Sequence, residues 1–194
     1  MSYADKGTLV RILVIADISP KLGMSLPDFV AVHGIDVVVS AGDLTRYDFA
    51  GIDRVTVPVL GVYGNHCDGR YLKDLRMTNL HLTRVEVGGV SFTGLEGCVR
   101  YKSDTPDVLY TQRQYRRMIR KLPTADVLVT HCPPRGINDH DDPAHVGIDA
   151  LGNWLEHNRP QLMIHGHTYP SQPMTQYGDT RIEYVRGARI VLFE

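Results

Sequence analysis

Five short polar motifs, widely separated along the chain, consist of residue types that bind metal ions and transfer protons. They are Asp17, Gly42-Asp43, Gly64-Asn65-His66, His131 and Gly166-His167. Carboxylate, amide and neutral imidazole groups are hard to borderline ligands that suit manganese, iron, zinc or nickel. Two such ions ~3.5–4 Å apart can activate a bridging hydroxide and clamp a phosphate. A nearby histidine can protonate the leaving oxygen, because an ordinary imidazole titrates close to neutral pH. The motifs therefore predict a metal-bound phosphate site.

Each motif begins where an apolar, β-branched run ends, so the elements that position the motifs are predicted to be strands. Ligands of open sheets gather outside the strand ends, and five such ends can therefore meet in one place. We expect the five motifs to converge within roughly 10 Å, the span of a two-metal site. The predicted strands are Val10–Ala16, Val37–Ala41, Val59–Tyr63, Val127–Thr130 and Leu162–His165.

Helical stretches and two hairpin signals separate these strands, which predicts an α/β fold with a mixed sheet. Ser25–Val32 is predicted to be a helix, because Pro27 lies in its first turn and Gly34 just past its end. Apolar stripes at helical spacing predict two further helices, and Gly88-Gly89 and Arg186-Gly187 each predict a hairpin turn. These helices are Thr111–Lys121 and His145–His157, and the hairpins join Val85–Val87 to Val90–Thr93 and Thr180–Val185 to Ala188–Phe193.

The composition predicts one domain, residues 1–194, with no membrane partner and no bulk attraction to nucleic acid. The 21 basic residues balance 22 acidic residues, and no basic stripe favours a nucleic-acid partner. No apolar run approaches the ~20 residues of a membrane span, and the N-terminal region lacks a signal-peptide pattern. Three scattered cysteines do not resemble a disulfide framework, so we expect a cytoplasmic location.

The motifs and their order resemble those of the calcineurin-like metallophosphoesterases. That family shows Asp-x-His, Gly-Asp, Gly-Asn-His with a following acidic residue, a lone His, and Gly-His-x-His. The resemblance runs from residue 10 to the end of the chain, and Thr130–Gly136 and His145–Gly147 also resemble segments of compact members. It implies two packed mixed β-sheets flanked by helices, a four-layer αββα sandwich with the site at one edge. It also implies a hydrolase that cleaves phosphate esters with divalent metal ions.

Carried over by position, the resemblance implies one complete and one incomplete metal site. The incomplete site would take Asp17, the bridging Asp43 and two histidines. Ser19 and Tyr169 stand where those histidines are expected. We therefore expect one tightly bound ion, with manganese favoured and iron, zinc and nickel open, and a second site that is weak or empty. An alternative register is open, in which His165 completes the weaker site. The complete site takes Asp43, Asn65, His131 and His167.

His66 matches the catalytic histidine of the family. Cys67 stands where an acidic residue usually orients that histidine, although Asp68 follows it, and a thiol orients an imidazole poorly. The resemblance implies hydrolysis of a phosphate mono- or diester by a metal-activated water, with His66 as general acid. The alternative is a catalytically weak or inactive binding or scaffold module of the same fold. We expect a small phosphorylated substrate; cyclic nucleotides are also open, as is the oligomeric state.

Several basic, acidic and cysteine residues outside the five motifs could either take part in the site or have an ordinary structural role. Arg70 and Arg135 could each bind a phosphate oxygen, although exposed arginines are common. Lys21 could supply positive charge where an ion is lost, and Cys67 and Cys132 are best interpreted as small buried filler. One acidic run has the composition of a metal cluster but is more typical of a solvated loop, with only His145 resembling a family segment near the substrate. This run contains Asp139, His140, Asp141, Asp142 and His145.

Overall fold

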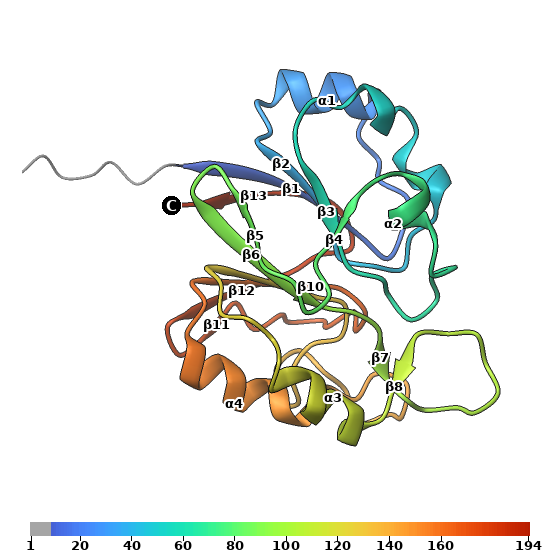
Figure 1. Cartoon of the computed structure of the whole chain (residues 1–194), viewed down its shortest axis with the longest axis vertical. Helices are drawn as coiled ribbons and strands as arrows, with labels where there is room; N and C mark the ends of the chain where they lie inside the picture. The colour runs from blue at the N-terminus through green and yellow to red at the C-terminus, as the bar shows by residue number, and fades with distance from the viewer. Residues whose placement is uncertain (1–8) are drawn as a thin grey trace, which may run out of the picture.

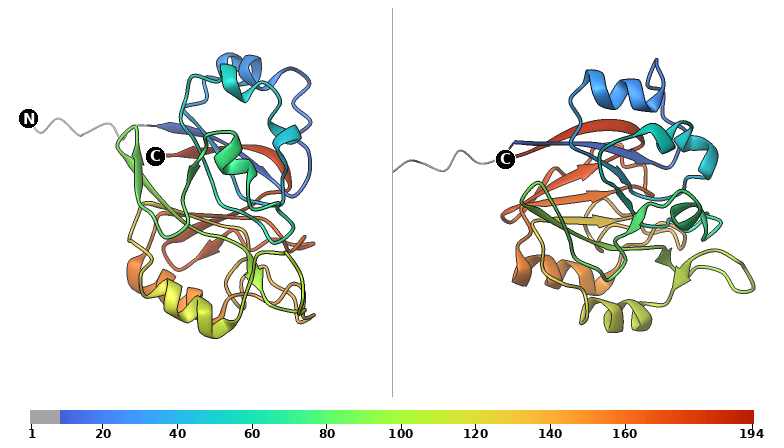
Figure 2. Two further views of the ribbon diagram at one scale, coloured as in Figure 1. Left: turned by 45° about the vertical axis from the view of Figure 1, so that its right-hand side comes forward. Right: turned by 45° about the horizontal axis from the view of Figure 1, so that its top comes forward.

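Two mixed β-sheets pack face to face, and helices cover the outer face of each sheet (Figure 1, Figure 2). The computed structural model describes residues 9–194; residues 1–8, the start of the predicted domain, lie outside the described residues. The layers follow the order helix, sheet, sheet, helix. The predicted α/β fold of two packed mixed sheets flanked by helices is therefore confirmed.

The first sheet consists of β1 (Val10–Ala16), β2 (Val37–Ser40), β3 (Val59–Gly61), β4 (Thr78–Asn79) and β13 (Gly187–Phe193). Its strand order is β13-β1-β2-β3-β4. Strands β1 to β4 run parallel, and β13 pairs with β1 in the antiparallel direction. From Ile12 onward β1 is buried on both faces, which explains why its sequence is continuously apolar rather than alternating.

The second sheet consists of β5 (Val85–Val87), β6 (Val90–Leu95), β9 (Val127–Thr130), β10 (Leu162–His165), β11 (Gln176–Tyr177) and β12 (Thr180–Tyr184). Its order is β11-β12-β10-β9-β6-β5, with parallel central strands and an antiparallel hairpin at each edge. A separate parallel ribbon pairs β7 (Cys98–Val99) with β8 (Leu109–Tyr110).

The helices are divided between the two outer faces. Those on the first sheet are α1 (Leu26–Val32) and α2 (Tyr71–Asp74), with the 3₁₀ turns η1 (Arg46–Phe49) and η2 (Ile52–Arg54); those on the second are α3 (Gln112–Ile119) and α4 (Asp149–Asn158). Side chains cap α1 and α3, since Ser25 accepts from Asp28 N–H and Thr111 forms a capping box. Within residues 9–194, no helix combines the length and apolar character that crossing a bilayer requires.

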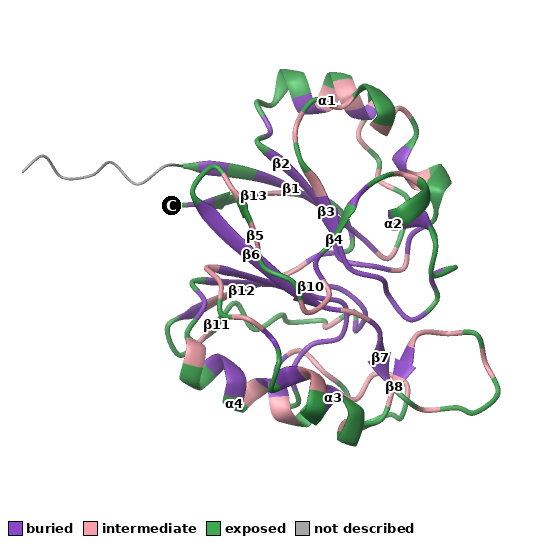
Figure 3. Cartoon of the chain, in the orientation of Figure 1, coloured by how far each residue is buried: buried purple, intermediate pink, exposed green. Residues whose placement is uncertain are grey.

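Alternate residues of the strands belong to separate apolar cores, and Figure 3 shows that most central strand residues are buried whereas much of the outer helices is exposed. In β1, Ile12 and Val14 belong to the central core between the sheets, where Phe92 of β6 is fully buried. Leu13 and Ile15 belong instead to the core beneath α1 and α2. The period of two along each strand therefore divides one apolar run between two layers.

The second predicted hairpin is wrong, because the strands on either side of Arg186-Gly187 belong to different sheets. β12 pairs with β10 in the second sheet, whereas β13 pairs with β1 in the first. Val185 is buried at this crossing, and Gly187 has a φ of 82°, which favours glycine. β12 forms its hairpin with β11 instead.

The helix predicted from His145 begins later, at Asp149. Gly147 lies against the backbone of Pro134, where a Cβ would overlap the Pro134 carbonyl, and Ile148 forms a bridge to Pro134. This contact holds the segment extended and leaves His145 on a loop. The other predicted strands and helices are confirmed, with ends that differ by at most about two residues.

Phe92→Ala is expected to lower the free energy of unfolding by about 3–5 kcal/mol, because it removes a fully buried ring from the central core. Leu192→Ala is the control, since Leu192 on β13 is 45% exposed and its truncation should change stability by less than ~0.5 kcal/mol. Denaturant unfolding followed by circular dichroism measures both values. Equal losses would contradict the packing of the two sheets around Phe92.

Candidate metal centre

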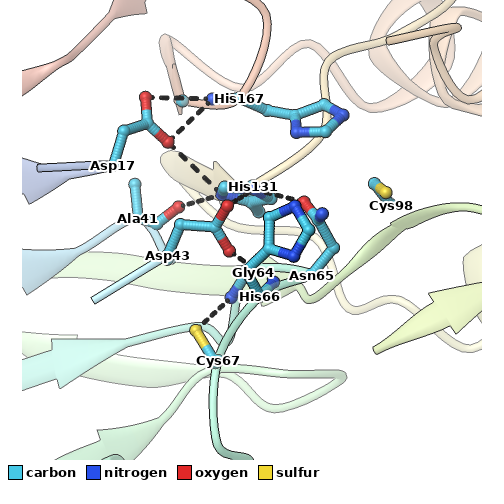
Figure 4. A network of polar contacts seen from close by, with 12 residues as sticks. Asp17, Ala41, Asp43, Gly64, Asn65, His66, Cys67, Cys98, His131 and His167 are labelled. Atoms are coloured by element: carbon cyan, nitrogen blue, oxygen red, sulfur yellow. Dashed lines mark hydrogen bonds and ion pairs between the residues drawn. The ribbon is translucent and has the colours of Figure 1, made fainter. Parts of the chain in front are cut away.

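The five polar motifs meet at one edge of the sandwich, where strands of both sheets end (Figure 4). Asp17, Asp43 and Asn65 follow β1, β2 and β3 of the first sheet. His131 and His167 follow β9 and β10 of the second sheet. The structure therefore brings the motifs together as predicted, although the outermost residues are 150 positions apart in the chain.

Three residues of this edge adopt a left-handed backbone conformation directly after their strands. The φ angles are 65° at Asp17, 54° at Asp43 and 76° at His167. Such a conformation outside glycine costs on the order of 1–3 kcal/mol and persists where the surrounding structure enforces it. Strain of this kind concentrates at functional sites. Here the Asp17 carboxylate accepts the His167 backbone N–H, and the ligand atoms of Asp43 and His167 lie within 4.8 Å of that of His131 (Figure 4).

Two glycines allow the strand ends to approach this closely. A Cβ at Gly42 would lie 2.6 Å from Gly64 Cα and 2.7 Å from His131 Nδ1. A Cβ at Gly64 would overlap the Asp43 carboxylate and backbone. The glycines of the Gly-Asp and Gly-Asn-His motifs are therefore required by contact between the motifs.

His131 lies fully buried at the centre of the group. Its Nδ1–H donates to the Ala41 carbonyl at 2.9 Å, so Nε2 faces Asn65 Oδ1 at 2.9 Å and Asp43 Oδ2 at 3.4 Å. Burial lowers the pKa of His131, but the carboxylates of Asp43 and Asp17 outweigh it and raise the pKa to about 9. Without a metal ion, the imidazole is therefore held as a cation between two carboxylates.

His167 is held as a neutral imidazole. Its Nε2–H donates to the Ala144 carbonyl at 2.9 Å, which leaves the Nδ1 lone pair free. Burial, reinforced by the positive charge of His131, lowers the pKa of His167 to about 3. A backbone carbonyl that fixes the tautomer and orientation of a histidine is a common support for a metal ligand.

The group fits a divalent metal ion. The candidate ligand atoms of Asp43, His131 and His167 all lie within 4.8 Å of one another. Asn65 directs its amide oxygen at the same nitrogen of His131, so electron-rich atoms converge on one point. Burial raises the pKa of the Asp43 carboxyl, but His131 outweighs this effect and brings it to about 2, so Asp43 is ionised. These donor types suit manganese, iron, zinc or nickel.

Asp17 occupies the other side of His131, with Oδ1 3.9 Å from Nδ1. Both carboxylate oxygens accept the backbone N–H of His167, at 3.1 and 3.2 Å. Burial raises the pKa of Asp17 to about 6, because its effect outweighs the opposing effects of the His131 cation and the His167 N–H. This side of the group therefore holds a carboxylate that is harder to ionise than Asp43.

A model of the calcineurin-like phosphoesterase family matches residues 10–171. The chain belongs to this family. The family depends on divalent metal ions, which agrees with the buried group of Asp43, His131 and His167. Membership indicates a phosphoester hydrolase.

Solved structures with the same fold are similar to this calcineurin-like protein at low sequence identity. TT1561 of Thermus thermophilus has a TM-score of 0.62 and 14% identity, with 96% of this chain and 99% of that chain covered. A dimetal phosphatase from Danio rerio has a TM-score of 0.57 and 14% identity, with coverage of 92% and 87%. GAP50, the anchor in the inner membrane complex of Plasmodium, has a TM-score of 0.53 and 13% identity, with coverage of 91% and 71%. No curated protein matches the sequence.

Ser19 and Tyr169, which stand where the resemblance expects histidines, have other partners. Ser19 is exposed, and its hydroxyl donates to the Asp48 carboxylate. Tyr169 is 48% exposed, and the guanidinium of Arg186 lies 4.8 Å from the centroid of its ring. Burial raises the pKa of the Tyr169 phenol, so it is neutral and a poor ligand. Neither side chain therefore supplies an imidazole at the position where the resemblance expects one.

His165 lies outside the metal group. It is fully buried, its Nδ1–H donates to the Gly166 carbonyl at 2.9 Å, and its Nε2 accepts from Asn138 at 2.9 Å. Both ring nitrogens are therefore occupied, and burial lowers its pKa to about 4. This geometry favours His167 over His165 as the histidine of the predicted metal site.

The two arginines considered for phosphate binding, Arg70 and Arg135, differ in their surroundings. Arg135 pairs with Asp139 and Asp141 of its own loop, at 3.1 and 2.8 Å. Arg70 is exposed at the start of α2, and Lys21 is also exposed. Of the acidic run, His145 comes nearest to the metal group, because its ring centroid lies 5.3 Å from that of His167.

Two charged residues near the site escaped the sequence interpretation. Asp107 Oδ2 lies 3.4 Å from His66 Nδ1. Arg186 lies beside Asp17, because Gly187 pairs with Ala16 in the register of β13 and β1. Neither residue follows a long apolar run of the kind that marked the other motifs. The one available signal for Asp107 is Cys67, because it occupies the place of the acidic residue that usually orients His66.

At neutral pH, binding of a divalent ion is expected to release about one proton, because the ion must displace the proton of His131, whose metal-free pKa is about 9. His167, with a pKa of about 3, should release none. Titration calorimetry in buffers of different ionisation enthalpy measures the release, which should disappear well above pH 9. Proton-independent binding at neutral pH would contradict the buried His131 cation.

Proposed function

We propose that this protein is a metal-dependent phosphoesterase that hydrolyses small phosphate mono- or diesters. The observation that carries the proposal is the buried group of Asp43, His131 and His167, whose ligand atoms lie within 4.8 Å. Asp43 and His131 pair with one another in the absence of an ion, but the converging ligand atoms of all three residues also suit a divalent cation, beside which a phosphate would bind.

The chain's own residues have distinct roles in the proposed reaction. Asp43, Asn65, His131 and His167 would hold the ion, which when bound lowers the pKa of a water and neutralises phosphate charge. His66 has a side chain that is 58% exposed, and its backbone N–H donates to Asp43 Oδ1 at 2.7 Å. Its imidazole is therefore beside the proposed ligands yet accessible to a substrate, as a proton donor to the leaving oxygen must be.

We infer one tight ion and a second position that is weak. Mixed carboxylate, amide and imidazole ligands support manganese, with iron, zinc and nickel as the other candidates. On the second side only Asp17 and the shared Asp43 remain as ligands. Ser19 bonds to Asp48 and Tyr169 is neutral, which supports the inference.

The fold alone does not decide between enzyme and scaffold, so the proposal depends on the site. Among structures similar to this chain, one is a dimetal phosphatase and another is an anchor. The accessible His66 supports the enzyme, since a scaffold has no use for a general acid. A cytoplasmic location belongs to the same proposal and is supported by three free, buried cysteines at 67, 98 and 132.

After loading with Mn²⁺ and dialysis, the protein is expected to retain about one ion per chain. His131→Ala should retain none, because it removes a central ligand of the proposed site. His157→Ala, at an exposed histidine of α4, is the matched control and should retain the ion. Elemental analysis measures the content, and two equally tight ions would contradict the single tight site.

His66→Ala should retain the ion but hydrolyse phenyl phosphate esters roughly 10²–10⁴-fold more slowly, the usual contribution of a general acid. Wild-type turnover should disappear with a chelator and return with Mn²⁺. Steady-state kinetics with mono- and diesters measure these effects. A wild-type protein that binds the ion and hydrolyses no ester would overturn the proposed activity and favour the scaffold module.

A further inference from the structure

Neither of the two residues that follow His66 orients its imidazole ring. Cys67 is buried, and its sulfur accepts the Gly64 N–H at 3.0 Å. Burial raises the pKa of this thiol to about 12, so it carries no negative charge. The Asp68 carboxylate accepts the N–H groups of Arg70 and Tyr71 at 2.8 and 2.9 Å, in the turn that leads into α2. A partner for His66 must come from elsewhere in the chain.

Asp107 supplies a carboxylate from the loop between β7 and β8. Its Oδ2 lies 3.4 Å from His66 Nδ1. The Asp107 side chain is only 14% exposed, whereas that of His66 is 58% exposed, so the carboxylate lies on the protein side of the ring. Contacts of catalytic histidines are often long in ligand-free proteins and shorten when substrate binds, so this distance suits an orienting contact.

Backbone hydrogen bonds fasten this loop to the Gly-Asn-His motif. Val108 N–H donates to the Asn65 carbonyl at 3.0 Å, and Gly97 N–H donates to the Tyr63 carbonyl at 2.8 Å. The residues on either side of His66 and Asp107 are therefore held in register. The fold therefore places the backbones of His66 and Asp107 close enough for their side chains to meet.

Lys102 holds Asp107 in its ionised form. Its ammonium lies 2.5 Å from Asp107 Oδ2 and lowers the pKa of the Asp107 carboxyl below its usual range. Asp107 therefore accepts a hydrogen bond and cannot donate one. The structural alternative is that Asp107 serves only to pair Lys102 and close the loop.

We propose that Asp107 is a positioning residue that accepts the Nδ1–H of His66 and thereby leaves Nε2 to deliver a proton to the leaving oxygen. The inference rests on the proposed phosphoesterase function. The proton passes from Nε2 to the ester oxygen as the phosphorus–oxygen bond breaks, and solvent returns a proton to the imidazole. Asp107 stays ionised throughout and touches neither the substrate nor the proposed metal ligands.

Asp107→Asn tests the inference, with Asp104→Asn as the matched control. Asp104 is exposed in the same loop, and both changes remove one negative charge. We expect Asp107→Asn to lower kcat ten- to a hundredfold, roughly the loss when other imidazole-orienting partners are removed. The loss should be larger for phenyl than for 4-nitrophenyl esters, because nitrophenolate leaves without protonation. Asp104→Asn should lose less than about twofold.

A double-mutant cycle separates positioning from loop closure. In a His66→Ala background, Asp107→Asn should have no further effect, because its only route to the reaction has been removed. Metal content should equal that of the wild type in each variant. A loss that persists without His66, or one equal to that of Asp104→Asn, would overturn the inference in favour of the Lys102 pairing alone.

The tautomer of His66 gives a readout that does not require activity. In zinc-loaded protein with ¹⁵N-labelled histidine, the His66 signals are identified by their absence in His66→Ala. The neutral ring should carry its proton on Nδ1 in the wild type and in Asp104→Asn, but on Nε2 in Asp107→Asn. If the wild type hydrolyses no ester, the proposed function fails while this spectrum still decides the role of Asp107. An unchanged tautomer in Asp107→Asn would overturn that role.

Discussion

The burial of two carboxylates around one imidazole is the constraint on which the site depends. The side chains of Asp17 and Asp43 are 0% and 12% exposed, and His131 lies 3.9 and 3.4 Å from them. Water does not screen charges at these positions, so their repulsion must be compensated locally. Without a metal ion, His131 supplies that charge as a cation with a pKa of about 9. The close approach at Gly42 and Gly64 follows, because a wider site would leave the charges unpaired.

Hydrogen bonds between strand ends within each sheet, and the packing of the two sheets on one another, hold this arrangement in place. The Asp17 N–H donates to the Gly42 carbonyl at 3.0 Å, which joins two strand ends of the first sheet. The Gly166 N–H donates to the His131 carbonyl at 3.2 Å, which joins two ends of the second. The central apolar core then fixes one sheet against the other. The free energy of this packing sustains the left-handed residues at the strand ends and holds the side chains in place before any ligand binds.

The sequence predicts what is local or repeated, and fails where distant segments decide the structure. Apolar runs that stop at polar motifs located the strands, and the rule for strand ends then brought the motifs together. The hairpin at Arg186-Gly187 was predicted wrongly, because alternation cannot reveal that its two strands pair in different sheets. Asp107 was missed for the same reason, since its distance from His66 depends on the pairing of β7 with β8. The start of α4 depended on a contact between Gly147 and Pro134 that no local pattern encodes.

The two sides of the site differ in how positive charge is supplied. On the Asp43 side the His131 cation supplies the charge in the absence of a metal ion, and in the proposed enzyme an ion from solution would replace its proton. On the Asp17 side the backbone N–H of His167 and the positive charges of His131 and Arg186 oppose the effect of burial, which still raises the pKa of the carboxyl to about 6. A guanidinium is permanently charged and can hold a phosphate oxygen, but it cannot turn a bound water into hydroxide as a metal ion does. In the proposed enzyme, activation of the water would therefore depend on the ion held on the Asp43 side, where the ligand atoms of Asp43, His131 and His167 converge.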